Sequence, residues 1–67
     1  MKGHQFFCNN IQSLDTLVSI CNRHGIDPVT DRRLFELVVM DVNMTADLLT
    51  DLVNAKQYYS EYKCEVV

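Results

Sequence analysis

Apolar residues recur at helical spacing through the second half of this chain. From residue 34 to residue 53 they keep helical spacing, with Asp41 in the apolar series between Val38 and Met44, and no Gly or Pro follows Pro28. The pattern therefore predicts a long amphipathic helix. Alternatively, Asn43 or Thr45 caps a third helix and the long segment breaks near Asn43. The residues that define the pattern are Leu34, Leu37, Val38, Met44, Leu48, Leu49, Leu52 and Val53.

A shorter helix is predicted ahead of this segment. Ser13 and Asp15 suit a helix start, and Gly25 suits its end because Gly readily adopts the left-handed conformation that terminates helices. Thr30-Asp31 then offers a start for the second helical segment. The apolar positions of the first helix are Leu14, Leu17, Val18 and Cys21.

These patterns predict an all-α fold in a single helical domain that spans residues 1–67. The first helix forms a hairpin with the long second segment, residues 1–10 are irregular, and residues 63–67 fray. A domain this short buries only about 60% of the surface of its unfolded chain. Because 48% of the residues are hydrophobic, we expect a homo-oligomer or a partner protein to cover the remaining apolar surface.

The cysteines and the absence of apolar runs bear on where the protein works. The chain has three cysteines, Cys8, Cys21 and Cys64. Their odd number and wide spacing fit neither a disulfide framework nor a zinc site. The N-terminal residues lack the apolar core of a signal peptide, and no run approaches the about 20 apolar residues of a membrane span. We therefore expect a cytoplasmic protein with reduced thiols and no membrane contact.

Charge argues against direct binding to nucleic acid. Six basic residues stand against nine acidic ones, for a net charge of −3. No cluster of cations is larger than the pair Arg32-Arg33, whereas binding through phosphate neutralisation needs several clustered cations.

Asp41 is the most unusual residue of the predicted long helix, because it falls within the apolar stripe. A carboxylate there is costly unless a helix end, a cation or water compensates its charge. Asp47 and Asp51 lie four residues apart on one helical face, and Tyr58 and Tyr62 extend the stripe beyond Val53. We predict a partner-binding surface made of Asp41, Asp47, Asp51, Tyr58 and Tyr62.

Catalytic signatures are missing from the sequence. His4 and His24 stand apart from any Ser/His/Asp order, Gly-rich phosphate loop or metal-binding spacing. His24 suits the C-terminal end of a helix, where it complements the helix dipole. We therefore expect no enzyme activity, no cofactor and no metal.

Residues 17–34 also fit a helix-turn-helix pattern, which gives an alternative function. Cys21, Gly25 and Leu34 match its small, turn and apolar positions. In that reading, Thr30, Arg32 and Arg33 contact DNA. Asp31 breaks the pattern, because it stands where the second helix normally packs an apolar side chain.

A resemblance to a known family rests on residues 13–17, Thr30-Asp31, Leu34 and residues 46–48. At these positions the chain resembles the Hha/YmoA family of small enterobacterial expression modulators. The resemblance implies an all-helical fold and a regulator that binds the dimerisation region of the nucleoid protein H-NS. Asp41 falls one position from the acidic residue of the family's long helix. Val42-Asn43 replaces the family's histidine and arginine, and the chain has no tryptophan.

Together, the patterns and the resemblance predict a small regulatory protein that acts by protein–protein contact and modulates a nucleoid or transcription factor. Two alternatives are the helix-turn-helix DNA-binding protein and a self-associating helical module without a catalytic role.

Overall fold

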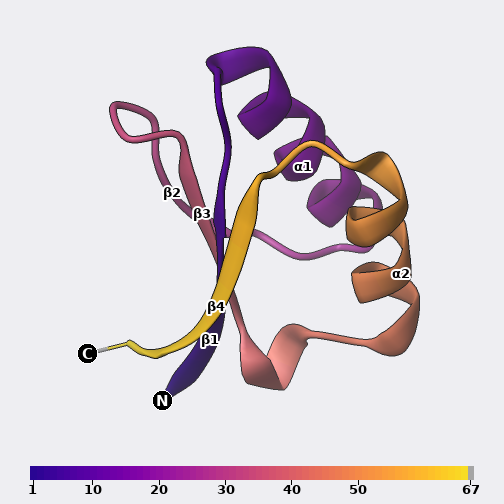
Figure 1. Cartoon of the computed structure of the whole chain (residues 1–67). Helices are drawn as coiled ribbons and strands as arrows, with labels where there is room; N and C mark the ends of the chain where they lie inside the picture. The colour runs from indigo at the N-terminus through magenta and orange to yellow at the C-terminus, as the bar shows by residue number, and fades with distance from the viewer. Residues whose placement is uncertain (67) are drawn as a thin grey trace.

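The chain folds as two helices packed on one face of a four-stranded sheet (Figure 1), in a computed structural model that describes residues 1–66. This mixed architecture shows that the all-α prediction was wrong. The elements in chain order are β1 (Lys2–Phe7), α1 (Ile11–Arg23), β2 (Val29–Asp31), β3 (Glu36–Met40), the 3-10 turn η1 (Asp41–Asn43), α2 (Ala46–Ala55) and β4 (Ser60–Glu65).

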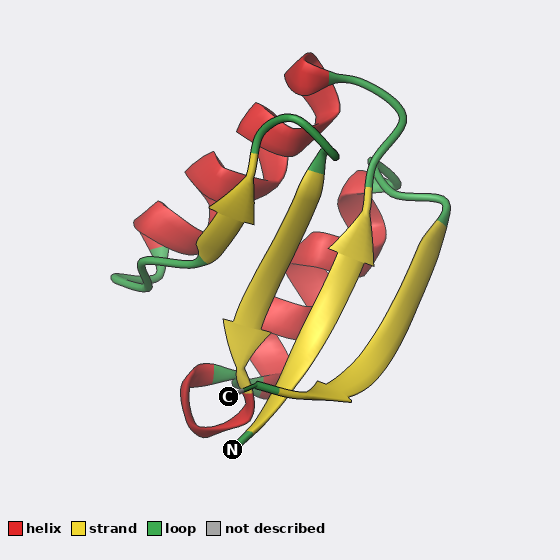
Figure 2. Ribbon diagram, turned by 90° about the vertical axis from the view of Figure 1, so that its left-hand side faces the viewer, coloured by secondary structure: helices red, strands yellow, loops and turns green. Residues whose placement is uncertain are grey.

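The strands are arranged in the order β2-β3-β1-β4, and every neighbouring pair is antiparallel. Each helix connects two strands that have a third strand between them, which is the β-α-β-β-α-β topology of ferredoxin-like folds. Figure 2 shows the sheet from the side that carries no helix, with both helices behind it. One face of the sheet is therefore covered and the other is open.

Helix α1 forms where the sequence predicted a helix, and its caps are local. Asn10 begins it, because its side-chain oxygen accepts a hydrogen bond from the Ser13 backbone at 2.8 Å, so the start lies before the Ser13 of the prediction. The helix ends at Arg23, and Gly25 follows the capping residue His24 with a φ of 75°, the left-handed conformation expected just beyond a helix end. The side chains that α1 buries are Leu14, Leu17, Ile20 and Cys21.

The long second helix is absent, and residues 29–40 form a β-hairpin instead. The side chain of Asp31 was interpreted as a helix start, but its Oδ1 accepts hydrogen bonds from the backbones of Arg33 (3.0 Å) and Leu34 (3.3 Å) and so closes the turn. Beyond the turn, Leu37 and Val39 are fully buried and alternate with half-buried neighbours. The burial period in β3 is therefore two, not 3.6.

Helix α2 confirms the alternative in which a separate helix starts after a break. The Thr45 hydroxyl oxygen accepts a hydrogen bond from the Leu48 backbone at 3.1 Å, which makes Thr45 its cap. Its final residue is followed by Lys56 in the left-handed conformation, with a φ of 54°. Leu48 and Leu52 are the side chains that α2 buries.

The core lies between the helices and the central strands β1 and β3. Tyr58 closes one end of it, with its ring 4.9 Å from that of Phe6 in an edge-to-face contact. Among residues 1–66, no polar or charged residue is fully buried. The fully or nearly fully buried side chains are Phe6, Cys8, Leu14, Leu17, Ile20, Cys21, Leu37, Val39, Leu48 and Leu52.

Both ends of the described chain belong to the sheet. Residues 1–10, expected to be irregular, contain β1, and residues 63–65, expected to fray, belong to β4; Val67 lies outside the described residues. The Val66 backbone donates a hydrogen bond to the Met1 carbonyl at 2.7 Å, so the two ends are adjacent.

Candidate functional site

The residues predicted to bind a partner are distributed over four parts of the molecule, and one of them, Asp41, begins η1 on the helix side of the sheet. Asp47 is exposed in the first turn of α2, and the Asp51 carboxylate lies 2.7 Å from Nε2 of His24. Tyr58 packs against the core and Tyr62 lies on the open face of the sheet. The five residues therefore do not form one surface.

The second helix required by the helix-turn-helix alternative is also absent. Thr30 lies in β2, and Arg32 and Arg33 lie in the turn that follows. Arg32 is paired with Asp15 of α1 at 2.9 Å. Without a recognition helix, residues 17–34 cannot enter the major groove in the way that this motif does.

Asp41 has its compensating charges within the chain. Its Oδ1 lies 3.2 Å from Nε2 of His4 and 3.6 Å from Nζ of Lys63. The register places His4 opposite both Val39 and Lys63, and Asp41 follows Val39 by two residues. The side chains of His4, Asp41 and Lys63 therefore all lie on the helix side of the sheet. The Asp41 side chain is 40% exposed; its charge is therefore not deeply buried, and the Lys63 ammonium and the His4 imidazole lie beside it.

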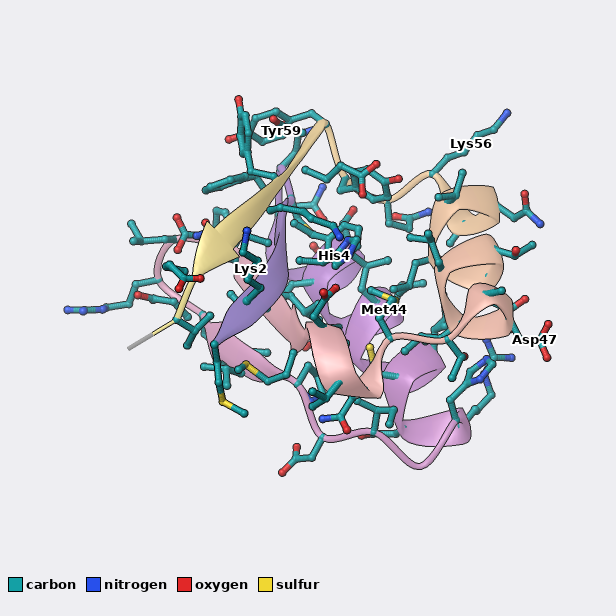
Figure 3. The ribbon with its side chains drawn as sticks, turned by 90° about the horizontal axis from the view of Figure 1, so that it is seen from below. Lys2, His4, Met44, Asp47, Lys56 and Tyr59 are labelled. Carbon is teal, nitrogen blue, oxygen red and sulfur yellow. The ribbon has the colours of Figure 1, made fainter. Side chains whose placement is uncertain are left out.

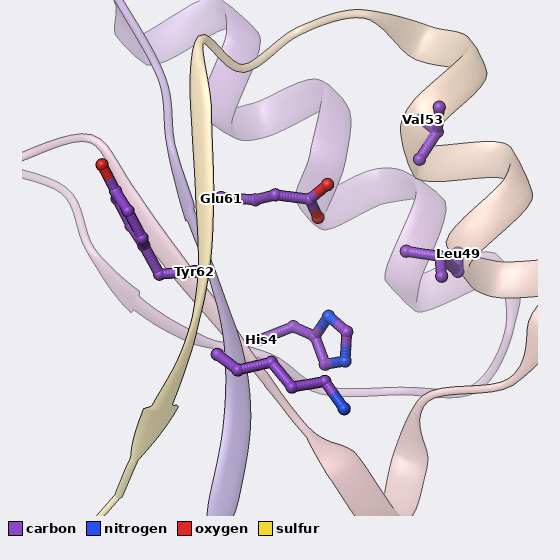
Figure 4. Close-up of a pocket in the computed structure, with 6 residues that line it drawn as sticks. His4, Leu49, Val53, Glu61 and Tyr62 are labelled. Atoms are coloured by element: carbon purple, nitrogen blue, oxygen red, sulfur yellow. The ribbon is translucent and has the colours of Figure 1, made fainter.

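The His4–Asp41–Lys63 cluster borders a cleft of about 280 Å³ between β4 and α2 (Figure 4). Leu49 and Val53 of α2 form an apolar wall, and Glu61 extends from β4 toward it. Figure 4 also shows that Tyr62 points away from α2. The cleft thus combines a charged floor with an apolar wall.

The open face of the sheet carries a cluster of aromatic rings. The Phe7 ring lies 5.6 Å from the Tyr62 ring and 6.3 Å from the Tyr59 ring. Tyr62 is 59% exposed and Tyr59 is 65% exposed, and Figure 3 shows Tyr59 on the side of the sheet away from α2. We call Phe7, Tyr59 and Tyr62 the aromatic patch. With Ser60, these residues line a shallow depression of about 210 Å³.

The open face also carries apolar residues on β2 and β3, separated from the aromatic patch by Gln5 and Glu36. The register places Val38 opposite Gln5 and Met40 opposite Gly3 on this face, and Val29 of β2 lies opposite Val38. Gln5 donates a hydrogen bond to Glu36 at 3.4 Å. The sequence analysis identified Tyr62 but missed Phe7 and Tyr59, although alternating polar and apolar residues in 61–66 were a signal for a strand.

Two of the three thiols, those of Cys8 and Cys21, are buried. Burial raises the pKa of the Cys21 thiol from 9.0 to about 11 and also raises the pKa of Cys8, so both thiols are protonated near neutral pH. In this described range no group of three or more His, Cys, Asp or Glu side chains is arranged to hold a metal ion. Neither helix in it has the length and apolar character needed to traverse a bilayer.

Comparisons with known proteins leave the site to be interpreted from its geometry. No protein-family model matches the chain, and no curated protein or solved structure gave a significant match.

Proposed function

We propose that this chain is a non-catalytic regulatory protein of the cytoplasm that binds another protein through the open face of its sheet. The observation that supports this proposal is the aromatic patch, in which Tyr59 and Tyr62 expose more than half of their surface on a sheet face that no described element covers. Tyr side chains offer large contact area and a polar tip, and they are enriched in protein interfaces.

A protein partner fits the open face better than a nucleic acid does. Sheets that bind single-stranded RNA stack bases on aromatic residues and carry cations for the phosphates. Here the charged strand residues on the open face are the carboxylates of Asp31 and Glu36, and the whole chain has a net charge of −3. The complementary partner is a protein with an apolar centre and flanking Lys or Arg side chains.

Catalysis has weaker support than binding. His4 and Asp41 form a pair of the kind that activates nucleophiles, but Lys63 shares the same carboxylate oxygen with His4, and no hydroxyl or thiol lines their cleft besides Tyr62, which points away. The regulatory role, with a nucleoid or transcription factor as the partner, comes from the sequence resemblance and stays a prediction.

Site-specific photo-crosslinking in cells tests the proposal. A photoreactive phenylalanine analogue replaces Tyr62 in one variant and Val42 in the matched control; Val42 is also an exposed apolar residue (79%) but lies in η1. We expect a discrete protein, identified by mass spectrometry, to be crosslinked from position 62 and not from position 42. The identified protein should then bind the purified chain, and Tyr59→Ser with Tyr62→Ser should weaken that binding at least tenfold.

Two results would overturn the proposal. One is equal crosslinking from both positions, which would mean that the sheet face is not selective. The other is a product containing RNA or DNA from position 62, together with a shift of an oligonucleotide by the purified chain at moderate salt.

A further inference from the structure

Strand β4 is an edge strand with a full row of backbone groups available for pairing. It pairs with β1 through residues 60–65, and Figure 2 shows no described element beside its outer side. The opposite edge of the sheet is formed by β2, which has only three residues. Exposed edge strands of six residues are templates for pairing with another strand.

The hydrogen-bonding direction of each β4 residue follows from the register. The Val66 backbone donates to Met1, the residue directly opposite, and in antiparallel ladders such hydrogen-bonded pairs alternate with non-bonded ones. The backbone groups of Ser60, Tyr62 and Cys64 therefore point toward β1. Those of Glu61, Lys63 and Glu65 point outward.

Side-chain charges on β4 distinguish among the ways in which two copies of this strand can pair. In antiparallel pairing, directly opposite residues have their side chains on the same face of the sheet. If all the helices are to lie on one side of the joined sheet, the two-fold axis must therefore pass between two copies of the same residue. An axis at Glu61 places two Glu61 carboxylates together, and an axis at Lys63 places two ammonium groups together. An axis at Tyr62 places Glu61 opposite Lys63 of the second copy on both sides of the axis. An axis at Cys64 also pairs opposite charges, Lys63 with Glu65, but it separates the two Tyr62 rings, whereas the axis at Tyr62 brings them together.

We propose that two copies of this chain pair through β4 in a symmetric antiparallel dimer, with Tyr62 on the axis, and so form one eight-stranded sheet. Glu61 and Lys63 are then hydrogen-bonded partners across the dimer, with complementary charges. The Lys63 side chain is 62% exposed, so its contact with Asp41 leaves it accessible to the second copy.

The same register joins the two aromatic patches. Tyr62 faces Tyr62 of the second copy at a non-hydrogen-bonded position, where side chains approach most closely. Each Tyr62 also contacts Phe7 of its own chain. The dimer therefore presents one continuous aromatic surface on the open face. The pairing does not depend on the proposed partner, because its backbone hydrogen bonds are made at the edge of β4.

Charge reversal tests the dimer and its register in one experiment. Glu61→Lys places Lys opposite Lys in the dimer, and Lys63→Glu places Glu opposite Glu. We expect sedimentation equilibrium to show a wild-type dimer at concentrations up to about 1 mM, because an edge contact is smaller than the interfaces of stable dimers. The dimer dissociation constant of each single variant should be at least tenfold higher than that of the wild type.

Mixing the two variants provides the rescue. In the Glu61→Lys variant both positions 61 and 63 carry lysine, and in the Lys63→Glu variant both carry glutamate. Every lysine of one chain therefore faces a glutamate of the other when the two variants pair in this register. An equimolar mixture should restore the dimer.

A disulfide trap provides the second readout. Opposite residues in non-hydrogen-bonded pairs have Cα atoms about 4.5 Å apart, within the range of a disulfide. Tyr62→Cys in a Cys64→Ser background should form a covalent dimer upon mild oxidation, faster than Val42→Cys in the same background. Circular dichroism of each variant verifies folding.

The proposal is overturned by a wild-type chain that remains monomeric at about 1 mM. It is also overturned if folded Glu61→Lys and Lys63→Glu self-associate as the wild type does, or if their mixture stays monomeric. Position 62 lies on the dimer axis, so a crosslink from it to a second copy of this chain belongs to the dimer. Only a crosslink from position 62 to a different protein supports the proposed function, and the two proposals can therefore fail separately.

Discussion

Nε2 of His4 lies 3.2 Å from the carboxylate of Asp41, so a residue near the start of β1 contacts the residue that follows β3. The contact explains how the chain accommodates a carboxylate that the sequence pattern placed within an apolar stripe. Asp41 lies at the end of a strand, beside His4 and Lys63, and retains access to water.

We expect Asp41→Ala to cost less than about 1 kcal/mol of unfolding free energy, because partly exposed ion pairs contribute little. Urea unfolding at neutral pH, at low and at high salt, measures this cost, and salt should reduce it. Asp27→Ala, at an exposed position in the α1–β2 connection, serves as the control. A loss of several kcal/mol would instead indicate that Asp41 is essential for folding.

Alkaline pH should destabilise the fold through Cys21. Its pKa rises from 9.0 to about 11 on burial, so between these values the unfolded chain loses a proton that the folded chain keeps. Stability present below pH 9 is therefore lost as pH rises toward 11, by at most about 1.4 kcal/mol per pH unit. Urea unfolding from pH 8 to pH 10.5 should show a smaller slope for Cys21→Ala than for Cys64→Ala. Equal slopes of unfolding free energy against pH in the two variants would show that Cys21 is not the source of the alkaline destabilisation.

Gly3→Ala should destabilise the sheet by about 1–3 kcal/mol through overpacking. A Cβ atom at this position would lie 2.8 Å from Cγ1 of Val38 and 3.0 Å from Cγ2 of Val66. Combining Gly3→Ala with Val38→Ala should recover part of the loss, since the closest atom is removed. Thermal unfolding of the two single variants and the double variant tests this coupling, and strict additivity would argue against the clash.

Thr45→Ala should cost about 1 kcal/mol, because Thr45 caps α2. Asn43→Ala removes the other residue that the sequence offered as a cap, but Asn43 lies in η1. Its replacement should change stability by less than about 0.5 kcal/mol. Chemical denaturation distinguishes the two variants; the reverse order would assign the cap to Asn43.

Both helices were detectable in the sequence because their determinants are local. Gly25 follows the end of α1, and Thr45 begins α2 in one of the two readings that the pattern allowed. The strands depend on partners that are distant in sequence. Leu34, Leu37 and Val38 mimic helical spacing, although Leu34 is an exposed turn residue and Leu37 and Val38 point to opposite faces of β3.

The candidate site was only partly predictable for the same reason. Asp41 and Tyr62 were identified as unusual residues, but His4 and Phe7, which contact them, come from a segment expected to be irregular. The alternation of charged with other residues in 61–66 indicates a strand. The helical interpretation assigned Tyr58 and Tyr62 to a continuation of the apolar stripe and so placed them on one surface.

The hydrogen bond between Val66 and Met1 has a practical consequence for protein engineering. Fluorescent labels placed at Met1 and at Val66 would lie at the same corner of the molecule, so they would report on each other rather than on a distance across the fold. A short linker between these two residues, with the chain opened among the exposed residues 32–34, would keep every strand pairing.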